Sequence, residues 1–163
     1  MIVSLSGMSV IREDLKKEGL TVVFTNGVFD VIHRGHIEYL NKAKDYGDIL
    51  IVGVNSDSSV KRLKGDTRPI NCESDRLIVV DCLKPVDYTV LFDTDTPYDM
   101  IKSLIPDILV KGADYDPLIT DNRDKRYIVG SDIVKASGGK VVAVELVPGR
   151  SSTDTINKLR QNR

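Results

Sequence analysis

Two histidines three positions apart are the residues whose spacing most clearly suggests chemistry. His33 and His36 bracket Gly35, at the point where an apolar, β-branched run ending near Thr25 gives way to a helical pattern. The first turn of a helix presents free backbone N–H groups and a partial positive charge, and a glycine lets ligand oxygens approach the backbone closely. Imidazole N–H groups at this spacing can both reach a phosphate. The pattern therefore predicts a phosphate-binding site.

These histidines have two other interpretations, one structural and one as metal ligands. A lone histidine near a helix start is usually structural, but the chain contains only two histidines and they bracket the same glycine. Zinc is disfavoured because no cysteine or third histidine lies nearby and the His-x-x-x-His spacing is absent. Asp30 is a possible third ligand, although its position favours hydrogen bonds that hold the turn. We therefore expect no metal ion bound by protein side chains.

The rest of the chain supplies the elements that must position these residues. Apolar runs rich in β-branched residues alternate with helical patterns, which is typical of a parallel α/β sheet. We expect one Rossmann-like domain over residues 21–163, with helices on both faces of a parallel sheet, and an N-terminal helical extension over residues 1–20. Strands are expected at 21–25, 49–54, 88–92, 108–111 and 140–146, and helices at 9–18, 35–45, 56–65 (after a turn), 74–83, 97–104, 127–137 and 152–160.

Length and composition exclude several classes of protein. With 163 residues, 41% hydrophobic and 29% charged, the chain can form a sizeable core, and neither disorder nor a membrane span is expected. The net charge of −1 gives no global basic field for nucleic acid. The apolar run before Arg12 is too short for a signal peptide, so reduced thiols and a cytoplasmic location are expected. Cys82 falls on an apolar helical stretch and is expected in the core, whereas Cys72 is given no catalytic role.

Polar segments follow several strands of the expected sheet. They occupy residues 26–36 after the first strand, 55–57 after the second, the residues from Lys111 onward, and those after the last strand. In open α/β sheets, ligands bind beyond the carboxyl ends of the strands. We therefore expect four segments that are distant in sequence to meet at one crevice.

The same segments carry a family resemblance. Residues 33–36 (HRGH) resemble the HxGH signature of the nucleotidylyltransferase superfamily. Residues 25–30 (TNGVFD), 54–59 (VNSDSS), 63–71 (LKGDTRPIN) and 109–115 (LVKGADY) resemble, in this order, the D-glycero-β-D-manno-heptose 1-phosphate adenylyltransferases of bacterial heptose biosynthesis. HxGH alone is only moderately specific, but its combination with the last two segments is specific for the heptose enzymes. The resemblance extends from about residue 21 to near the C-terminus.

The resemblance implies a role for each matching residue, beside a structural role that residue type alone would allow. His33, His36 and Lys64 are expected to be catalytic. The substrate-binding residues are expected to be Asn55, Asp57 and Arg68. The nucleotide-binding residues are expected to be Thr25, Asn26, Gly27, Phe29, Gly35, Arg76, Lys111, Gly112, Asp114, Ser151, Ser152 and Thr153. By residue type alone, Lys64 and Arg68 suit a solvated loop, Arg76 suits a surface helix, and Ser152 suits a helix N-cap.

The chain also departs from the related enzymes. Residues 149–153 resemble the G-x-S-T-T motif of the heptose enzymes, with Ser152 in place of a threonine, which keeps the hydroxyl group. Glycerol 3-phosphate cytidylyltransferases carry an arginine ahead of a similar motif, where this chain has Leu146. Residues 119–126 form a polar insertion, interpreted as a loop that is either a lid or an oligomer contact.

The expected reaction is adenylyl transfer from ATP to D-glycero-D-manno-heptose 1-phosphate, giving nucleotide-activated heptose and pyrophosphate for lipopolysaccharide or surface glycan synthesis. Catalysis is expected to come from positioning and charge neutralisation, with Mg²⁺ held mainly by the triphosphate. The expected partners are the nucleotide and the sugar 1-phosphate, with no nucleic acid and no membrane, in a homodimer or higher homo-oligomer. Open alternatives are cytidylyl or guanylyl transfer to another small phosphorylated substrate, such as glycerol 3-phosphate, and a catalytically weak nucleotide-binding regulatory module.

Overall fold

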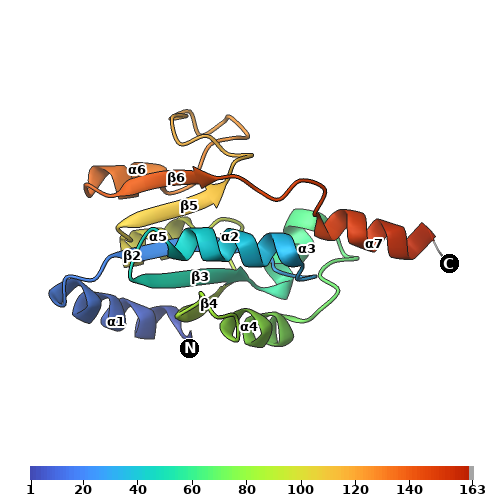
Figure 1. Ribbon diagram of the computed structural model, residues 1–163, viewed down its shortest axis with the longest axis horizontal. Coiled ribbons are helices and arrows are strands. Elements are labelled where there is room, and N and C mark those ends of the chain that lie inside the picture. The colour runs from blue at the N-terminus through green and yellow to red at the C-terminus, as the bar shows by residue number, and fades with distance from the viewer. Residues whose placement is uncertain (162–163) are drawn as a thin grey trace.

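The chain folds around one six-stranded parallel sheet. The computed structural model describes residues 1–161, apart from the side chains of Asp154 and Arg160. The sheet has the order β1-β4-β3-β2-β5-β6 and carries helices on both faces (Figure 1), so the predicted α/β class is confirmed. The strands are β1 (Ile2–Val3), β2 (Val22–Gly27), β3 (Ile49–Asn55), β4 (Tyr88–Phe92), β5 (Ile108–Gly112) and β6 (Lys140–Val144). The helices are α1 (Leu5–Lys17), α2 (Arg34–Lys44), α3 (Asp57–Lys64), α4 (Glu73–Asp81), α5 (Tyr98–Leu104), α6 (Ser131–Ala136) and α7 (Ser152–Gln161).

The central strands are apolar along their length because both faces of the sheet are covered. Successive side chains of a strand point to opposite faces, so β3 contributes to two cores. Leu50 and Val52 pack with Leu40 of α2 and Val80 of α4 on one face. On the other face, Ile51 belongs to a second core cluster, together with Met8, Phe24, Met100, Ile101, Leu104 and Leu109.

The strand order creates a crevice beside β2. From β2 the chain adds β3 and then β4 on one side, and it then crosses back to place β5 on the other side of β2. Such a reversal of strand order leaves space beyond the carboxyl ends of the two strands at the switch point. In-phase parallel pairing, with Asn26 opposite Gly53 and Gly27 opposite Val54, brings the ends of β2 and β3 to the same edge.

The first 20 residues contain a strand as well as the expected helix. Ile2 and Val3 pair with Thr89 and Val90 of β4 at the edge of the sheet. Helix α1 begins earlier than expected because the Ser4 hydroxyl accepts a hydrogen bond from the N–H of Gly7 at 3.1 Å, as an N-cap does. A strand of two residues is too short to give a periodic sequence signal. The division of the chain at residue 20 stays a prediction.

Two smaller predictions differ from the structure. Residues 127–130 form a turn before α6, which begins only at Ser131. The prediction that Cys82 lies in the core is wrong: α4 ends at Asp81, and Cys82 is its exposed C-cap.

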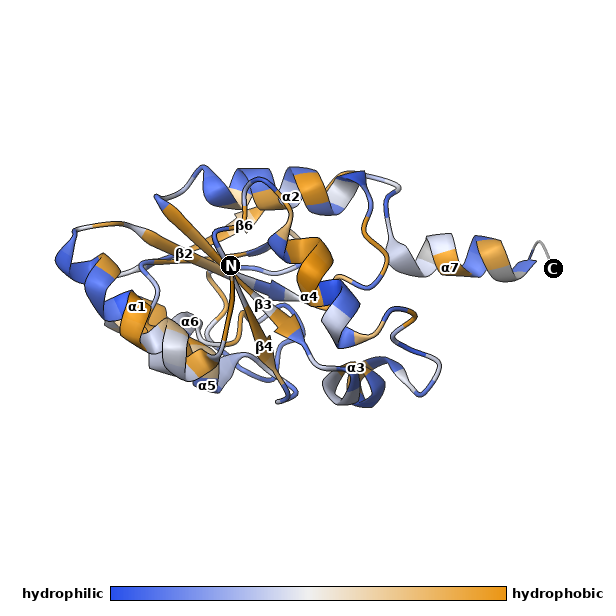
Figure 2. Cartoon of the chain, turned by 90° about the horizontal axis from the view of Figure 1, so that it is seen from below, coloured by the Kyte–Doolittle hydropathy of each residue, from blue (hydrophilic) through white to orange (hydrophobic). Residues whose placement is uncertain are grey.

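No helix among the described residues combines the length and apolar character needed to span a bilayer. Helix α7 projects away from the rest of the molecule, as Figure 2 shows, and it carries both hydrophilic and hydrophobic residues.

Candidate functional site

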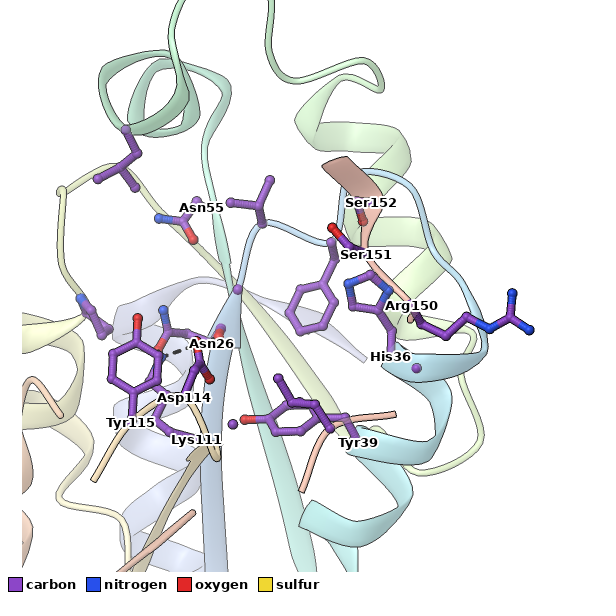
Figure 3. A pocket seen from close by; sticks show the side chains of 18 of the residues that line it. Asn26, His36, Tyr39, Asn55, Lys111, Asp114, Tyr115, Arg150, Ser151 and Ser152 are labelled. Carbon is purple, nitrogen blue, oxygen red and sulfur yellow. Dashed lines mark hydrogen bonds between the residues drawn. The ribbon is translucent and has the colours of Figure 1, made fainter. Parts of the chain in front are cut away.

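A cavity of about 580 Å³ lies at the carboxyl edge of the sheet, at the switch point between β2 and β5. The four segments expected to converge all contribute to its lining (Figure 3). Residues 95–97, which follow β4, add a fifth. The predicted residues that line it are Asn26, Gly27, Phe29, His33, Gly35, His36, Asn55, Lys111, Gly112, Asp114, Ser151 and Ser152.

The two histidines are held at the first turn of α2. His33 is the N-cap with extended backbone (φ −143°), and the two imidazole rings lie 4.0 Å apart between centroids. The backbone N–H of His33 donates to Nδ1 of His36 at 3.3 Å. Since Nδ1 is the acceptor, the neutral His36 ring carries its proton on Nε2. His36 therefore presents an N–H donor from this nitrogen, as a phosphate oxygen requires.

Burial and nearby positive charge favour the neutral form of both rings. Burial lowers the pKa of His36 to about 4, helped by the charges of His33 and Lys64. Burial and the charge of Arg150 lower the pKa of His33. An anionic triphosphate placed beside these rings would raise both pKa values. The site is thus suited to take up protons when an anion binds.

Close packing fixes the turn that carries the histidines. A Cβ atom on Gly35 would lie 3.0 Å from Cε1 of His33 and 3.3 Å from Cβ of Arg150. Phe29 is buried with a φ of 50°, in the left-handed region that costs a side-chain-bearing residue about 1–2 kcal/mol. Its ring centroid lies 5.6 Å from that of His36, and a Cβ on Gly27 would come within 3.1 Å of the same ring. The turn accommodates these rings because both neighbouring positions lack side chains.

Lys111 brings a positive charge to the end of β5. Its Nζ donates to Oδ1 of Asn26 at the end of β2 and lies 5.7 Å from the ring centroid of Tyr115. Burial lowers the pKa of Lys111 to about 8, although the carboxylate of Asp114 raises it. Gly112 follows with its backbone close to Asp114, because a Cβ there would lie 2.6 Å from Oδ1 of Asp114. Figure 3 shows Asn26, Lys111, Asp114 and Tyr115 grouped on this side of the cavity.

The start of α7 closes another side of the cavity. Ser151 and Ser152 line it, and the Ser152 hydroxyl donates to the backbone oxygen of Val31 at 2.9 Å. This bond connects the start of α7 to residues 28–36, which carry the two histidines and are called the histidine turn below. Thr153 is exposed and does not line the cavity.

Lys64 lies beside the cavity, at the end of α3. It is exposed and does not line the cavity, yet its charge contributes to the low pKa of His36. Desolvation and the charge of Arg68 lower the pKa of Lys64, while Asp30 raises it. Lys64 thus combines access to solvent with proximity to the histidines.

Four predicted ligand-binding side chains are engaged inside the protein instead. Arg76 is 1% exposed and donates to Val28 O, Asn71 O and the carboxylate of Asp57. The hydroxyl groups of Thr25 and Tyr39 lie 2.6 Å apart in the interior. Asp57, Arg76, Thr25 and Arg68 do not line the cavity, and their roles in ligand binding stay predictions.

Several lining residues were missed from the sequence. Tyr39 lies one helical turn after His36, a spacing that places both on one face of α2. Residues 95–97 follow the end of β4, so the argument from carboxyl ends could have found them. Leu146 and Val147 belong to the irregular segment after β6, which has no local pattern, and Arg150 occupies the variable position of the motif at residues 149–153. In the described part of the chain, no three His, Cys, Asp or Glu side chains are grouped as a metal site requires.

Comparison with known proteins identifies the family. Residues 24–157 match the model of the family described as cytidylyltransferase-like. The chain belongs to the cytidylyltransferase-like family. It is 50% identical over 153 residues to the bifunctional protein HldE of a Nitratiruptor species, covering 94% of this chain and 30% of that protein. It is 54% identical over 139 residues to the bifunctional protein HldE of Campylobacter curvus, covering 85% of this chain and 27% of that protein. The chain spans about a third of the length of these curated relatives.

Two solved structures share the fold. The lipopolysaccharide core biosynthesis protein from Thermoplasma volcanium matches with a TM-score of 0.59 and 30% identity, over 79% of this chain and 98% of that one. Pantoate-beta-alanine ligase from Francisella tularensis, complexed with beta-gamma ATP and beta-alanine, matches with a TM-score of 0.61 over 99% of this chain and 78% of that one. At 16% identity, the second likeness concerns the fold alone.

Proposed function

We propose that this member of the cytidylyltransferase-like family transfers AMP from ATP to D-glycero-D-manno-heptose 1-phosphate. An oxygen of the sugar phosphate attacks the α-phosphorus, the bond from that phosphorus to the bridging oxygen breaks, and pyrophosphate leaves. The observation that carries the proposal is the meeting of His33, His36 and Lys111 around one cavity at the β2–β5 switch point. Transfer of this kind depends on positioning and on neutralising phosphate charge, which is what these groups supply.

The choice of acceptor and base rests on the motifs and relatives. The segments at residues 63–71 and 109–115 resemble the heptose 1-phosphate enzymes, and the curated relatives HldE are described as bifunctional. The solved relative from Thermoplasma volcanium is described as a lipopolysaccharide core biosynthesis protein. These similarities favour an activated sugar for lipopolysaccharide or surface glycan synthesis, with ATP as the donor. A cytoplasmic location and a homo-oligomeric state are parts of the same proposal.

The two histidines serve as donors to the reacting phosphate in this proposal. Nε2 of His36 donates to an α-phosphate or bridging oxygen, and His33 assists beside it. Losing one such donor typically slows an enzyme by about 10²–10³-fold. Lys64 offsets the charge of the two approaching anions. Mg²⁺ enters as part of the Mg–ATP substrate and is held by triphosphate oxygens and water.

Lys111 and the start of α7 hold the nucleotide in this proposal. The half-buried Lys111 donates its ammonium to Asn26, which orients it, and Asp114 accepts from a sugar hydroxyl or base amine. The backbone N–H groups at the start of α7 face the phosphates, with Ser151 and Ser152. Asn55, which lines the cavity from the end of β3, belongs to the acceptor side.

The test is pyrophosphate release with Mg²⁺, crossing ATP, GTP and CTP against heptose 1-phosphate and glycerol 3-phosphate. Release with only ATP and heptose 1-phosphate supports the proposal in full. Release with another pair keeps the chemistry and overturns the substrates. Tight ATP binding without release from any pair would favour a nucleotide-binding regulatory module.

A further inference from the structure

A buried carboxylate joins the histidine turn to a loop 40 residues away. Asp30 is 3% exposed, and its carboxylate accepts from the backbone N–H groups of Ile70 (2.9 Å) and Asn71 (2.8 Å). It also accepts from Nε of Arg68 at 2.8 Å. The Asn71 side chain donates in return to the backbone oxygen of Asp30. One acidic residue thus satisfies several donors of a single distant segment.

This segment directly follows Lys64, which ends α3. The chain turns at Gly65, where φ is 87°, and the N–H of Arg68 bonds to the Gly65 oxygen at 3.0 Å. Asp30 therefore holds the chain only four residues beyond Lys64. On the other side, Asp30 follows the strained, buried Phe29 and precedes His33 by three residues. The chain segments that carry Lys64 and the two histidines, which are proposed to contact the reacting phosphates, are therefore both held by the Asp30 carboxylate.

Arg76 strengthens this connection from α4. Its guanidinium donates to Val28 O at 2.6 Å and to Asn71 O at 3.1 Å, so it bridges the same turn and the same loop. The Asp30 carboxylate is buried against Arg68, and the buried Arg76 guanidinium is paired with Asp57. The turn and the loop are held as one unit.

We propose that Asp30 is a positioning residue that holds Lys64 in register with His33 and His36 for the transfer step. The kinetic part rests on the proposed function, whereas the structural part rests on the hydrogen bonds alone. Asp30 also acts on Lys64 through charge: it raises the pKa of Lys64, against the lowering by desolvation and Arg68. His36 is the other titratable group whose pKa is coupled to the Lys64 charge.

The test compares Asp30→Asn with Asp107→Asn in the full chain. Asp107 offers a comparison carboxylate at the amino ends of the strands, where its side chain, 44% exposed against 1% for Asp30, pairs with Arg12 (3.0 Å) and accepts from the N–H of Val22 (2.8 Å). Pyrophosphate release gives kcat, KM and their pH dependence, calorimetry gives the ATP affinity, and amide hydrogen exchange reports on Ile70 and Asn71. Asn71→Ala, which keeps the backbone bonds, replaces Asp30→Asn if that variant does not fold.

Asp30→Asn is expected to lower kcat by about 10- to 100-fold, with little change in ATP affinity, because a misplacement of about 1 Å can cost 10²-fold. The alkaline limb of its pH profile should move to lower pH, since Lys64 loses a negative neighbour. Asn71→Ala should lower kcat by a smaller factor and leave the alkaline limb in place, because the Asp30 charge remains, and Asp107→Asn should change stability only. If Asp30→Asn has the same kcat, KM and alkaline limb of the pH profile as Asp107→Asn, the inference is overturned. If the wild type releases no pyrophosphate from any pair, the proposed function fails, and faster exchange at Ile70 and Asn71 then decides whether Asp30 holds the loop.

Discussion

Replacing Gly35 with alanine separates the stability of the histidine turn from its activity. Gly35 is the second residue of α2, and alanine is favoured over glycine in a helix by at most about 1 kcal/mol, the value for a helix interior. The added Cβ would lie 3.0 Å from Cε1 and Nδ1 of His33 and 3.3 Å from Cβ of Arg150. Carbon atoms pack best at about 3.5–4.0 Å, so the His33 ring must retreat by about 0.5 Å or more.

The change in helix propensity affects the free energy of unfolding, whereas the displacement of the His33 ring affects kcat. The gain in helix propensity offsets the cost of the crowded contact, so we expect the free energy of unfolding to stay within about 1 kcal/mol of the wild type. Activity has no such compensation, because a shift of about 1 Å in a reacting group can cost 10²-fold. We expect Gly35→Ala to retain its fold and to lose about 10- to 100-fold in kcat.

The assay is pyrophosphate release with ATP and heptose 1-phosphate, beside urea unfolding of the same samples. Gly7→Ala in α1 is the control, because it adds the same methyl group to a helix far from the cavity, 3.2 Å from the Ser4 hydroxyl. Wild-type kcat in Gly35→Ala would refute the reasoning that His33 must keep its place against Gly35. A loss of fold in Gly35→Ala but not in Gly7→Ala would show that the turn cannot relax.

Four further predictions concern the charged and titratable groups. His36→Ala and Lys64→Ala should keep the fold and each lower turnover by about 10²–10³-fold, because each removes a group that stabilises phosphate charge; near-normal turnover would exclude that residue from catalysis. The free energy of unfolding should fall as the pH drops from 6.5 to about 4, because the unfolded chain protonates His36 there and the native state does not; urea unfolding of His36→Gln should show a flatter dependence. ATP binding in this window should take up protons, which calorimetry in buffers of different ionisation enthalpy measures. Arg76→Met should destabilise the protein by about 3–5 kcal/mol, since it removes one partner of the ion pair with Asp57 and leaves two carbonyl oxygens without their donor; unchanged urea unfolding would argue against this network.

Most of the sheet could be predicted because its signals are local. The continuous apolar run at residues 49–54 gave β3 within one residue, and β4 was predicted with its observed bounds. Helix α2 was predicted within one residue at each end from its apolar spacing. Strand β1 could not be found, because two residues paired with β4 from 87 positions away carry no local pattern. Cys82 was misplaced because an apolar stretch does not reveal which face of α4 turns inward.

The cavity could be predicted in outline because parallel strands end at a common edge. Glycines and polar residues after β2, β3, β5 and β6 therefore met there, as expected. The roles of the individual charged residues were harder to predict, because a sequence shows that a residue is charged but not which group it contacts. Arg68 stands in a motif segment and Arg76 in the helix after it, and both were interpreted as ligand groups from the family resemblance, since arginines are mostly exposed or bound to anions. In the structure their anions are Asp30 and Asp57 of the same chain.

This outcome changes what the similarity in residues 63–71 signifies. Of its two proposed ligand-binding side chains, Lys64 stays exposed beside His36, whereas Arg68 is buried against Asp30. The backbone of Ile70 and Asn71 is bound by the same carboxylate. The segment thus contains residues that build the site as well as one that is proposed to act on the ligand. Resemblance in such a motif predicts the architecture of the cavity more reliably than the role of each charge. The buried carboxylate of Asp30 shows why, because it uses one charge of the motif, Arg68, to build the site.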